Sequence, residues 1–147
     1  MVDVNTPVRK GYFQRLNGAV MLDGQPVPVC DAFAPNTAKY PYIILSTQGD
    51  TGDSTKQSQS HEATLLVDIV TGFTGGATRT PVDLIAGQIL SMINPADLPD
   101  QIDVGPDLQI ISTRLLSDNT VTAQIGSYKI IRRLLRFGHN IHEQVKA

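Results

Sequence analysis

The sequence is poor in cysteine and in long apolar segments. Its one cysteine, Cys30, has no partner for an internal disulfide, which fits a reducing compartment. The longest apolar runs, such as residues 42–45 and 65–67, are far shorter than the roughly 18 residues that a membrane-spanning helix requires. Residues 1–10 contain no apolar segment of the kind found in a secretory signal. We therefore expect no disulfide framework, no membrane span and no secretory signal.

Complete motifs for catalysis or ligand binding are also lacking. His139 and His142 form an H-x-x-H pair whose rings would share a face on a helix but lie on opposite faces of a strand. Residues 49–56, GDTGDSTK, lack the spacing of a phosphate-binding loop and the alternating ligands of a calcium loop. Nothing in the sequence brings Cys30 and His61 together as nucleophile and base. We expect no catalytic residue, no metal site and no bound cofactor.

Charge is unevenly distributed along the chain, although the net charge is only −2. Residues 1–125 carry 7 basic and 13 acidic side chains, whereas residues 126–147 carry 5 basic side chains and Glu143 as their one acidic residue. Within the acidic part, residues 95–107 contain four aspartates and no basic residue. A chain with one acidic and one basic surface can pair with copies of itself, and neutralisation within the chain is the alternative.

Local signals predict a helix, a hairpin and an extended segment in the N-terminal part. Residues 5–16 repeat apolar side chains near the helical period, with Thr6 as N-cap and Pro7 at the first helical position. Asp23-Gly24 is a strong hairpin signal. Three prolines bias residues 27–45 toward extended backbone that enters a sheet.

The central part predicts two strands and the main helix. Residues 42–48 form the first strand, and residues 46–60 form a polar loop without an apolar anchor, of a length that is usually functional or disordered. Residues 61–73 alternate as a long strand with one well-buried face. Residues 81–93 carry an apolar stripe at helical spacing and begin at a capping signal.

The C-terminal part begins with the acidic connection at 95–107, followed by a strand at 108–116 and a turn at 117–119. Residues 127–141 are ambiguous, because apolar pairs at spacing four suit a helix and alternation suits a strand. Their β-branched and aromatic residues favour the strand. Together these elements predict one α+β domain over residues 1–147, with a mostly antiparallel β-sheet, one main helix packed on it and a short N-terminal helix.

The order of these segments is the most distinctive feature of the chain and spans most of residues 3–143. After the N-terminal helix come VPVCD at 27–31, KYPYIIL at 39–45, EATLLVDIV at 62–70, the helix at 81–93 and the basic RRLLRF at 132–137. In this order and composition the chain resembles the tail-completion, or tail-terminator, family of tailed bacteriophages.

The resemblance implies a structural virion protein rather than an enzyme. Members of this family are α+β subunits of an oligomeric ring at the phage neck or at the head-proximal end of the tail. Such a ring joins the tail to the head or connector, stops tube polymerisation and leaves a channel for DNA. The implied partners are copies of the same chain, other neck, connector or tail proteins, and DNA in the lumen without sequence recognition. The implied locations are the virion and, before assembly, the host cytoplasm.

The candidate contact residues lie in the polar loop and in the basic C-terminal segment. They are Gln48, Asp50, Thr51, Asp53, Lys56 and Gln57 in the loop, and Lys129, Arg132, Arg133 and Arg136 in the basic segment. On a strand, Arg132 and Arg136 share one face while Lys129 and Arg133 share the other. One pair could then meet acidic loops of a neighbouring copy, and the other could face a partner or a DNA-filled channel.

Two further function classes stay open. A small cytoplasmic enzyme of unknown reaction would need a polar pocket that joins His61, Cys30 or the aspartates. A nucleic-acid-binding module would use the basic C-terminal segment, and its binding would weaken steeply with salt. Sequence-specific DNA recognition is not expected, because the chain has neither a reading helix nor interleaved stacking aromatics.

Overall fold

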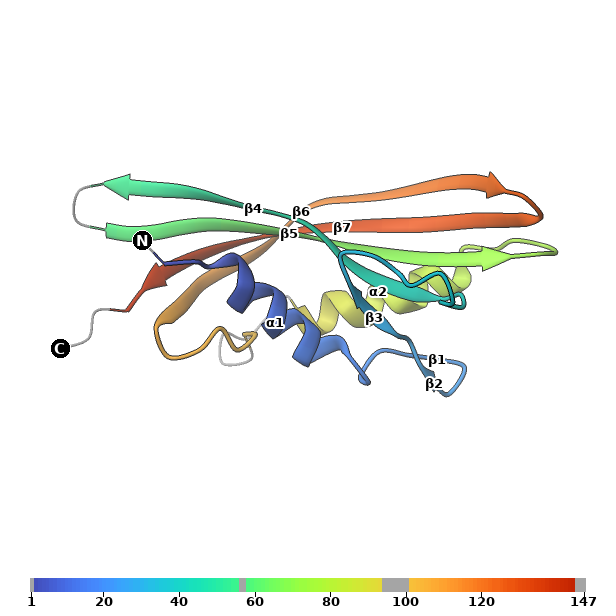
Figure 1. Ribbon diagram of the computed structural model, residues 1–147, viewed down its shortest axis with the longest axis horizontal. Helices are drawn as coiled ribbons and strands as arrows, with labels where there is room; N and C mark the ends of the chain where they lie inside the picture. The colour runs from blue at the N-terminus through green and yellow to red at the C-terminus, as the bar shows by residue number, and fades with distance from the viewer. Residues whose placement is uncertain (1, 56–57, 94–100, 145–147) are drawn as a thin grey trace.

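The computed structural model describes residues 2–55, 58–93 and 101–144, and for 52–55 and 58–59 it describes the backbone alone. In chain order the described elements are α1 (Asn5–Leu16), β1 (Met21–Leu22), β2 (Gln25–Pro26), β3 (Val29–Asp31), β4 (Tyr42–Thr55), β5 (Ser58–Phe73), α2 (Thr80–Ile93), β6 (Leu108–Ile125) and β7 (Tyr128–Glu143). This is the predicted α+β class, and both helices lie on one side of the main sheet (Figure 1).

The main sheet has five strands in the order β3-β4-β5-β7-β6, and β1 and β2 form a separate hairpin. Neighbouring strands of the main sheet are antiparallel except β3 and β4, which run parallel. The long strands extend beyond the helices at both ends (Figure 1). We call the side against α1 and α2 the helix-covered face and the opposite side the open face.

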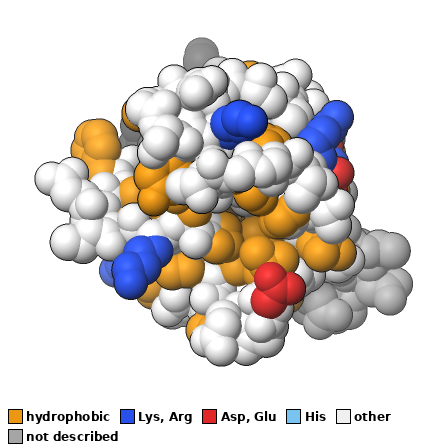
Figure 2. All heavy atoms as spheres, turned by 90° about the vertical axis from the view of Figure 1, so that its right-hand side faces the viewer, with side chains coloured by type: hydrophobic (Ala, Val, Ile, Leu, Met, Phe, Trp, Pro, Cys, Tyr) orange, Lys and Arg blue, Asp and Glu red, His pale blue; other side chains and the backbone are white. Residues whose placement is uncertain are grey.

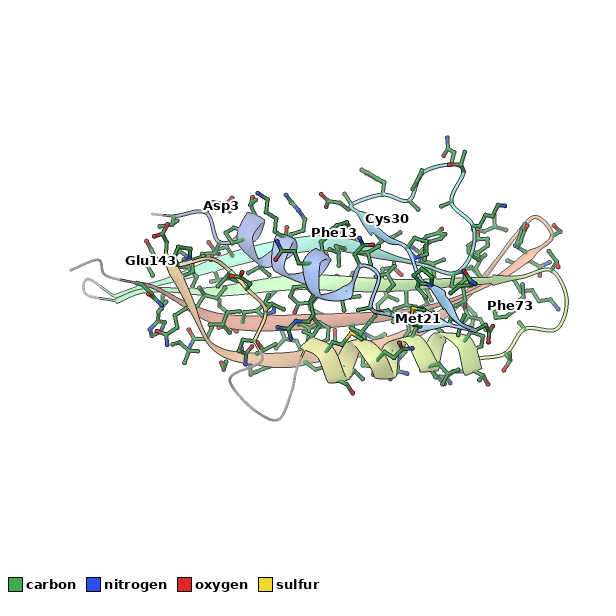
Figure 3. The ribbon with its side chains drawn as sticks, turned by 90° about the horizontal axis from the view of Figure 1, so that it is seen from below. Asp3, Phe13, Met21, Cys30, Phe73 and Glu143 are labelled. Carbon is green, nitrogen blue, oxygen red and sulfur yellow. The ribbon has the colours of Figure 1, made fainter. Side chains whose placement is uncertain are left out.

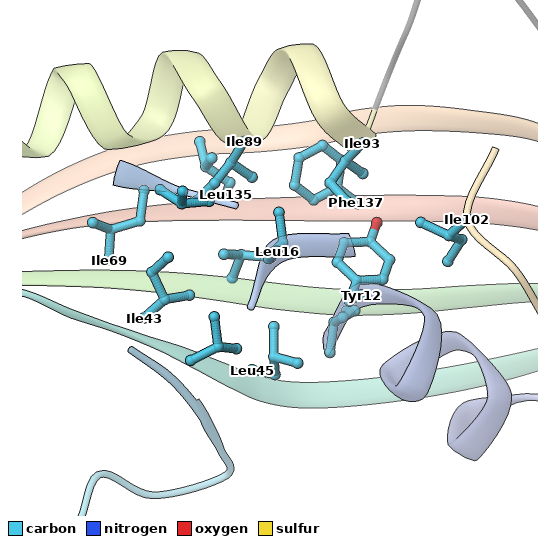
Figure 4. Packing of buried hydrophobic residues seen from close by; sticks show 14 of the residues in the cluster. Tyr12, Leu16, Ile43, Leu45, Ile69, Ile89, Ile93, Ile102, Leu135 and Phe137 are labelled. Atoms are coloured by element: carbon cyan, nitrogen blue, oxygen red, sulfur yellow. The ribbon is translucent and has the colours of Figure 1, made fainter. Parts of the chain in front are cut away.

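The core lies between the helices and the helix-covered face. Because side chains alternate along a strand, one face of β5 carries every second residue, and four of these are 0% exposed: Ala63, Leu65, Val67 and Ile69. The register sets Leu65 opposite Phe137 of β7, and Tyr12 of α1 packs on Phe137 with ring centroids 5.9 Å apart (Figure 4). Full burial of a side chain such as Leu65, Ile69 or Phe137 contributes roughly 1.5–3 kcal/mol.

Helix α2 packs through the apolar stripe that the sequence predicts. Its buried residues are Val82, Ile85, Ala86, Ile89 and Ile93. The helix begins at Thr80, and Asp83 lies in its first turn, where a negative charge stabilises the unpaired amides of the N-terminus.

Helix α1 has its predicted bounds but not its predicted cap. Thr6 lies inside the helix, and Val4 occupies the N-cap position without a side-chain hydrogen bond. The Asp3 carboxylate accepts hydrogen bonds from the backbone N–H groups of Asn5 at 2.9 Å and Thr6 at 3.5 Å. The Asp3 carboxylate, which precedes the helix, therefore accepts the N-terminal amide hydrogen bonds that the sequence analysis expected Thr6 to accept.

The prediction of a polar loop at residues 46–60 is wrong, because most of this segment is strand. β4 continues to Thr55, β5 begins at Ser58, and their ladder reaches the Thr55–Ser58 pair with one register shift after Leu45. Most of this hairpin extends past the start of α1 (Figure 1), so no hydrophobic layer selects apolar residues there. Backbone pairing with β5, which β7 continues as far as Ser60, holds the segment as strand instead.

The turn predicted at residues 117–119 is also wrong, whereas the strand preferred for 127–141 is confirmed. β6 continues to Ile125 and absorbs an extra residue after Ile110 and another after Leu115. Asp118 makes no turn because its carboxylate accepts two hydrogen bonds from the side chain of Arg133 on β7. The chain reverses instead at Gly126, whose φ of +60° suits glycine.

The acidic connection is described only from Gln101 onward, and residues 94–100, with Asp97 and Asp100, lie outside the described residues. Ile102 is 5% exposed and joins the core. The connection lies so close to α1 that a Cβ on Gly11 would be 2.7 Å from the carbonyl oxygen of Asp103. The described end of the connection is therefore packed against the helix.

Candidate interaction surface

Three tyrosines form a cluster at one end of the open face. The segment that joins β3 to β4 brings the Tyr40 ring to 5.5 Å from Tyr42 and 5.3 Å from Tyr128, measured between ring centroids. A Cβ on Gly72 would lie 2.5 Å from the Tyr40 ring, so glycine is required beneath it. The adjoining apolar layer consists of Ile44, Val70 and Ile130.

Arg132 and Asp68 form an ion pair on the open face. Asp68 is only 5% exposed, and the guanidinium of Arg132 donates to its two oxygens at 3.2 and 2.6 Å. This two-point contact raises the pKa of Arg132. The ion pair offsets the free energy that the Asp68 carboxylate loses when it is removed from water. Arg132 therefore has a structural role besides any contact with a partner.

Arg136 also lies on the open face, as the strand prediction requires. It donates to the hydroxyl of Thr47 at 3.0 Å. Further along the same face Arg114 of β6 forms an ion pair with Glu62 of β5. These contacts join side chains on neighbouring strands across an exposed surface, where ion pairs are individually weak.

Arg133 and Lys129 share the face of β7 opposite Arg132 and Arg136, as the strand prediction requires, and this is the helix-covered side. Arg133 donates to Asp118 of β6 at 2.9 and 2.7 Å and to Asp83 of α2 at 2.9 Å. The hydrogen bonds with Asp118 raise the pKa of Arg133 and lower the pKa of Asp118. Arg133 therefore joins the sheet to α2, whereas Lys129 is exposed.

The candidates on β4 have separate environments. The Gln48 side chain donates to the carbonyl oxygen of Asn5 at 2.8 Å and so connects β4 to the start of α1. Asp50 contacts His61, and Thr51 is exposed. The side chain of Asp53 and all of Lys56 and Gln57 lie outside the described residues. The seven predicted contact residues whose side chains the structure describes are thus distributed over both faces of the sheet rather than gathered at one site.

His61 links three strands beyond the helices. Its Nδ1 lies 3.1 Å from a carboxylate oxygen of Asp50 on β4, and its Nε2 lies 3.0 Å from Glu143 on β7. Burial alone would lower the pKa of His61, but the hydrogen bonds with Glu143 and Asp50 outweigh burial and raise it. Sequence analysis missed this contact because it joins residues from three strands whose register was unknown.

The remaining candidate groups do not converge on a chemical site. His139 is fully buried, and its Nε2 lies 2.6 Å from the Tyr12 hydroxyl, whereas His142 lies on the opposite face. Cys30 is beside Ile44, far along the sheet from His61. Among the described residues no group of three or more His, Cys, Asp or Glu could hold a metal ion. No helix within the described ranges is long and apolar enough to cross a membrane.

Both outer edges of the main sheet carry unpaired backbone. Among the described residues no strand pairs with the outer side of β6, and β3 covers β4 only as far as Leu45. Exposed apolar residues line β6, namely Ile111, Leu115, Leu116, Val121 and Ile125. Figure 2 views the end of the molecule with the β6–β7 turn, where hydrophobic side chains form patches within a mostly uncharged surface that carries a few charged side chains. Long apolar edges of this kind are sites of pairing with another chain.

A groove lies beside the free edge of β4. It has a volume of about 340 Å³ and is lined by Arg9, Lys10, Phe13, Gln14, Asp31 and Leu45. Phe13 is 40% exposed on the β3 side of α1 (Figure 3). The groove combines the apolar side chains of Phe13 and Leu45 with Lys10 and the Arg9–Asp31 ion pair at the position where β3 ends.

This fold occurs in a known particle. No family model and no curated protein matches the sequence. Among solved structures 23 chains match, and one of these belongs to "Virion of native gene transfer agent (GTA) particle". That chain is 16% identical to this one, with a TM-score of 0.73 and coverage of 97% of this chain and 99% of that chain. The two chains share one fold.

Proposed function

We propose that this protein is a structural component of a virion, without a catalytic role. The observation that carries the proposal is the match of the whole fold to a chain of a gene transfer agent particle, over 97% of one chain and 99% of the other. A match of that extent includes both helices and all the long strands rather than a common supersecondary motif. The order of segments along the sequence supports the same class.

More specifically, we propose a subunit of an oligomeric ring at the neck or at the head-proximal end of a tail. A ring requires a head-to-tail interface between two different surfaces of each subunit. The groove-flanked edge of β4 and the apolar edge of β6 are two such surfaces on opposite sides of the chain. Neck, connector or tail proteins would bind the ring above and below, after the subunit has folded in the host cytoplasm.

The ring would admit DNA without reading its sequence. Arg132 and Arg133, the centre of the basic segment, are both engaged with aspartates of this chain. Their charge is therefore largely neutralised within the chain, which favours non-specific proximity over tight DNA binding. The same pairing weakens the case for a nucleic-acid-binding module, and the separation of Cys30 from His61 weakens the case for an enzyme.

Negative-stain electron microscopy of the full-length protein tests the proposal, alone and after mixing with the tail and connector proteins of the same particle. We expect ring-shaped oligomers, and mass spectrometry should find the chain in purified particles. A strict monomer that binds none of those proteins and is missing from particles would overturn the proposal. Binding to DNA that depends on Arg136 and weakens steeply with salt would support the nucleic-acid module instead.

A further inference from the structure

The directions of the long strands allow the sheet to continue from one copy to the next. In the order β4-β5-β7-β6 every neighbour is antiparallel, so β4 and β6, at the two ends, run in opposite directions. A second copy related by rotation about an axis along the strands would place its β4 beside β6 of the first. The next β4 is four strand positions from the first and runs in the same direction, so it would again be antiparallel to the β6 beside it.

We propose that β6 of one copy pairs with the free edge of β4, residues 46–55, of the next copy, so that one sheet continues around the ring. The inference rests on the proposed ring and identifies its subunit interface. Edge pairing satisfies backbone N–H and C=O groups of both strands, and side chains then determine which edges can approach.

The groove beside β4 favours this partner. The register places Leu115 of β6 level with Phe137, Leu65 and Gln48 across the sheet. Leu115 points to the helix-covered side and is 36% exposed. If β6 of another copy is added to β4 at this same level, the Leu115 side chain of that copy would lie next to the groove that contains Phe13 and Leu45.

Pairing of two β6 edges is the competing arrangement. It would bury the exposed apolar residues of β6, but it would leave the β4 edge and its groove unfilled. A symmetric pair of that kind also closes as a dimer, with no surface left to add a third copy in the same way. The β6–β4 arrangement uses both edges of every copy and is the head-to-tail kind of interface that a ring requires.

Cysteine cross-linking distinguishes the two arrangements. With Cys30 replaced by Ser, Thr51→Cys on β4 is combined in turn with Ser112→Cys, Arg114→Cys, Ser117→Cys or Asn119→Cys on β6. All five positions lie on the open face, and Thr51 and Ser112 are at the same level across the sheet. Within one chain, β4 and β6 are three strand spacings apart, about 14 Å, which is too far for a disulfide. Any disulfide between them must therefore join two copies.

We expect one of the four pairs, or two adjacent ones, to give a ladder of covalent oligomers under mild oxidation. Thr51→Cys with Leu84→Cys, which lies exposed on α2, is the control and should remain at least about tenfold less cross-linked. Rings on the microscope grid without any β6–β4 cross-link would overturn the edge pairing and leave the ring proposal intact. Dimers formed by the β6 cysteines alone would favour the symmetric arrangement and contradict both proposals.

A charge on the edge provides a second test, which needs no cross-link and examines the register that places Leu115 beside the groove. Leu115→Lys would replace the apolar contact with Phe13 and Leu45 by an ammonium that must lose water beside Lys10 and an Arg9–Asp31 pair that is already formed. Leu84→Lys adds the same charge to an exposed helix position. We expect Leu115→Lys to raise the concentration needed for ring assembly at least about tenfold and Leu84→Lys to leave it unchanged. Circular dichroism confirms that both variants fold. Equal assembly by the two folded variants would contradict the interface.

Discussion

Adjacent residues of β7 show how differently the two faces of one sheet are held. Leu135 points to the helix-covered face and is 0% exposed, whereas Leu134 points to the open face and is half-buried. On the helix-covered face the helices exclude water from a continuous apolar layer. On the open face Ile44, Val70 and Ile130 form a small buried cluster, and the remaining contacts are separate polar ones, of which the Arg132–Asp68 ion pair is the most buried. The first face therefore maintains the fold, and the second can exchange its water for a partner.

Truncation of these two leucines gives the largest expected contrast. Leu135→Ala removes methyl groups from the closed layer and leaves a cavity, so we expect a loss of about 2–5 kcal/mol in the free energy of unfolding. Leu134→Ala removes the same atoms from a partly solvated position and should cost about 1 kcal/mol. Urea unfolding followed by circular dichroism measures both. Similar losses would show that another subunit or an unrecognised contact closes the open face.

The same contrast explains what the sequence could predict. The helix-covered face follows from alternation in residues 63–69 and from the stripe of α2, because burial against a helix selects apolar side chains at fixed spacing. The hairpin beyond α1 could not be recognised, because strands held by backbone pairing outside a core leave no hydrophobic pattern.

The candidate contacts show the same limit. The strand prediction correctly assigned Arg132 and Arg136 to one face and Arg133 to the other. It could not find their partners, since Asp68, Asp83 and Asp118 are between 15 and 64 residues away and depend on register. The sheet edges were missed for a similar reason, because an edge exists only once the order of strands is known.

Removal of an arginine from the open face should give an intermediate effect. Arg132→Gln leaves the Asp68 carboxylate 5% exposed and without its two-point partner, so we expect a loss of about 1–3 kcal/mol at neutral pH. Arg136→Gln loses one hydrogen bond to Thr47 at the surface and should cost about 0.5 kcal/mol or less. Chemical unfolding of both variants gives the comparison. Equal losses would mean that Asp68 does not depend on Arg132.

The smallest expected effect concerns two histidines that lie on the same face with opposite surroundings. His61 is held between Asp50 and Glu143, and the hydrogen bonds raise its pKa despite burial. His139 lies in the core, where burial lowers its pKa. Its Nδ1 is 2.8 Å from the carbonyl oxygen of Ala63, which can only accept, so Nδ1 carries the proton of a neutral ring.

These shifts act on stability in opposite directions. The contribution of His61 is complete below the pKa of an unfolded histidine, about 6.5, and is lost as the pH rises through its raised folded value. The contribution of His139 is complete above about pH 6.5 and decreases as the pH falls toward its lowered folded value. Between them, the two groups place a maximum of stability near pH 6.5.

Unfolding free energies measured from about pH 5.5 to 8.5 test the opposite roles of the two histidines. The quantity compared is the slope of the unfolding free energy against pH rather than its absolute value. His61→Gln should remove the decrease on the alkaline side and keep the decrease on the acidic side, whereas His139→Gln should do the reverse. Each slope is at most about 1.4 kcal/mol per pH unit for one proton. Because only the slope is compared, a general loss of stability in the buried His139→Gln variant does not obscure the result. An alkaline slope that persists in His61→Gln would show that a group other than His61 produces it and would contradict the role assigned to His61.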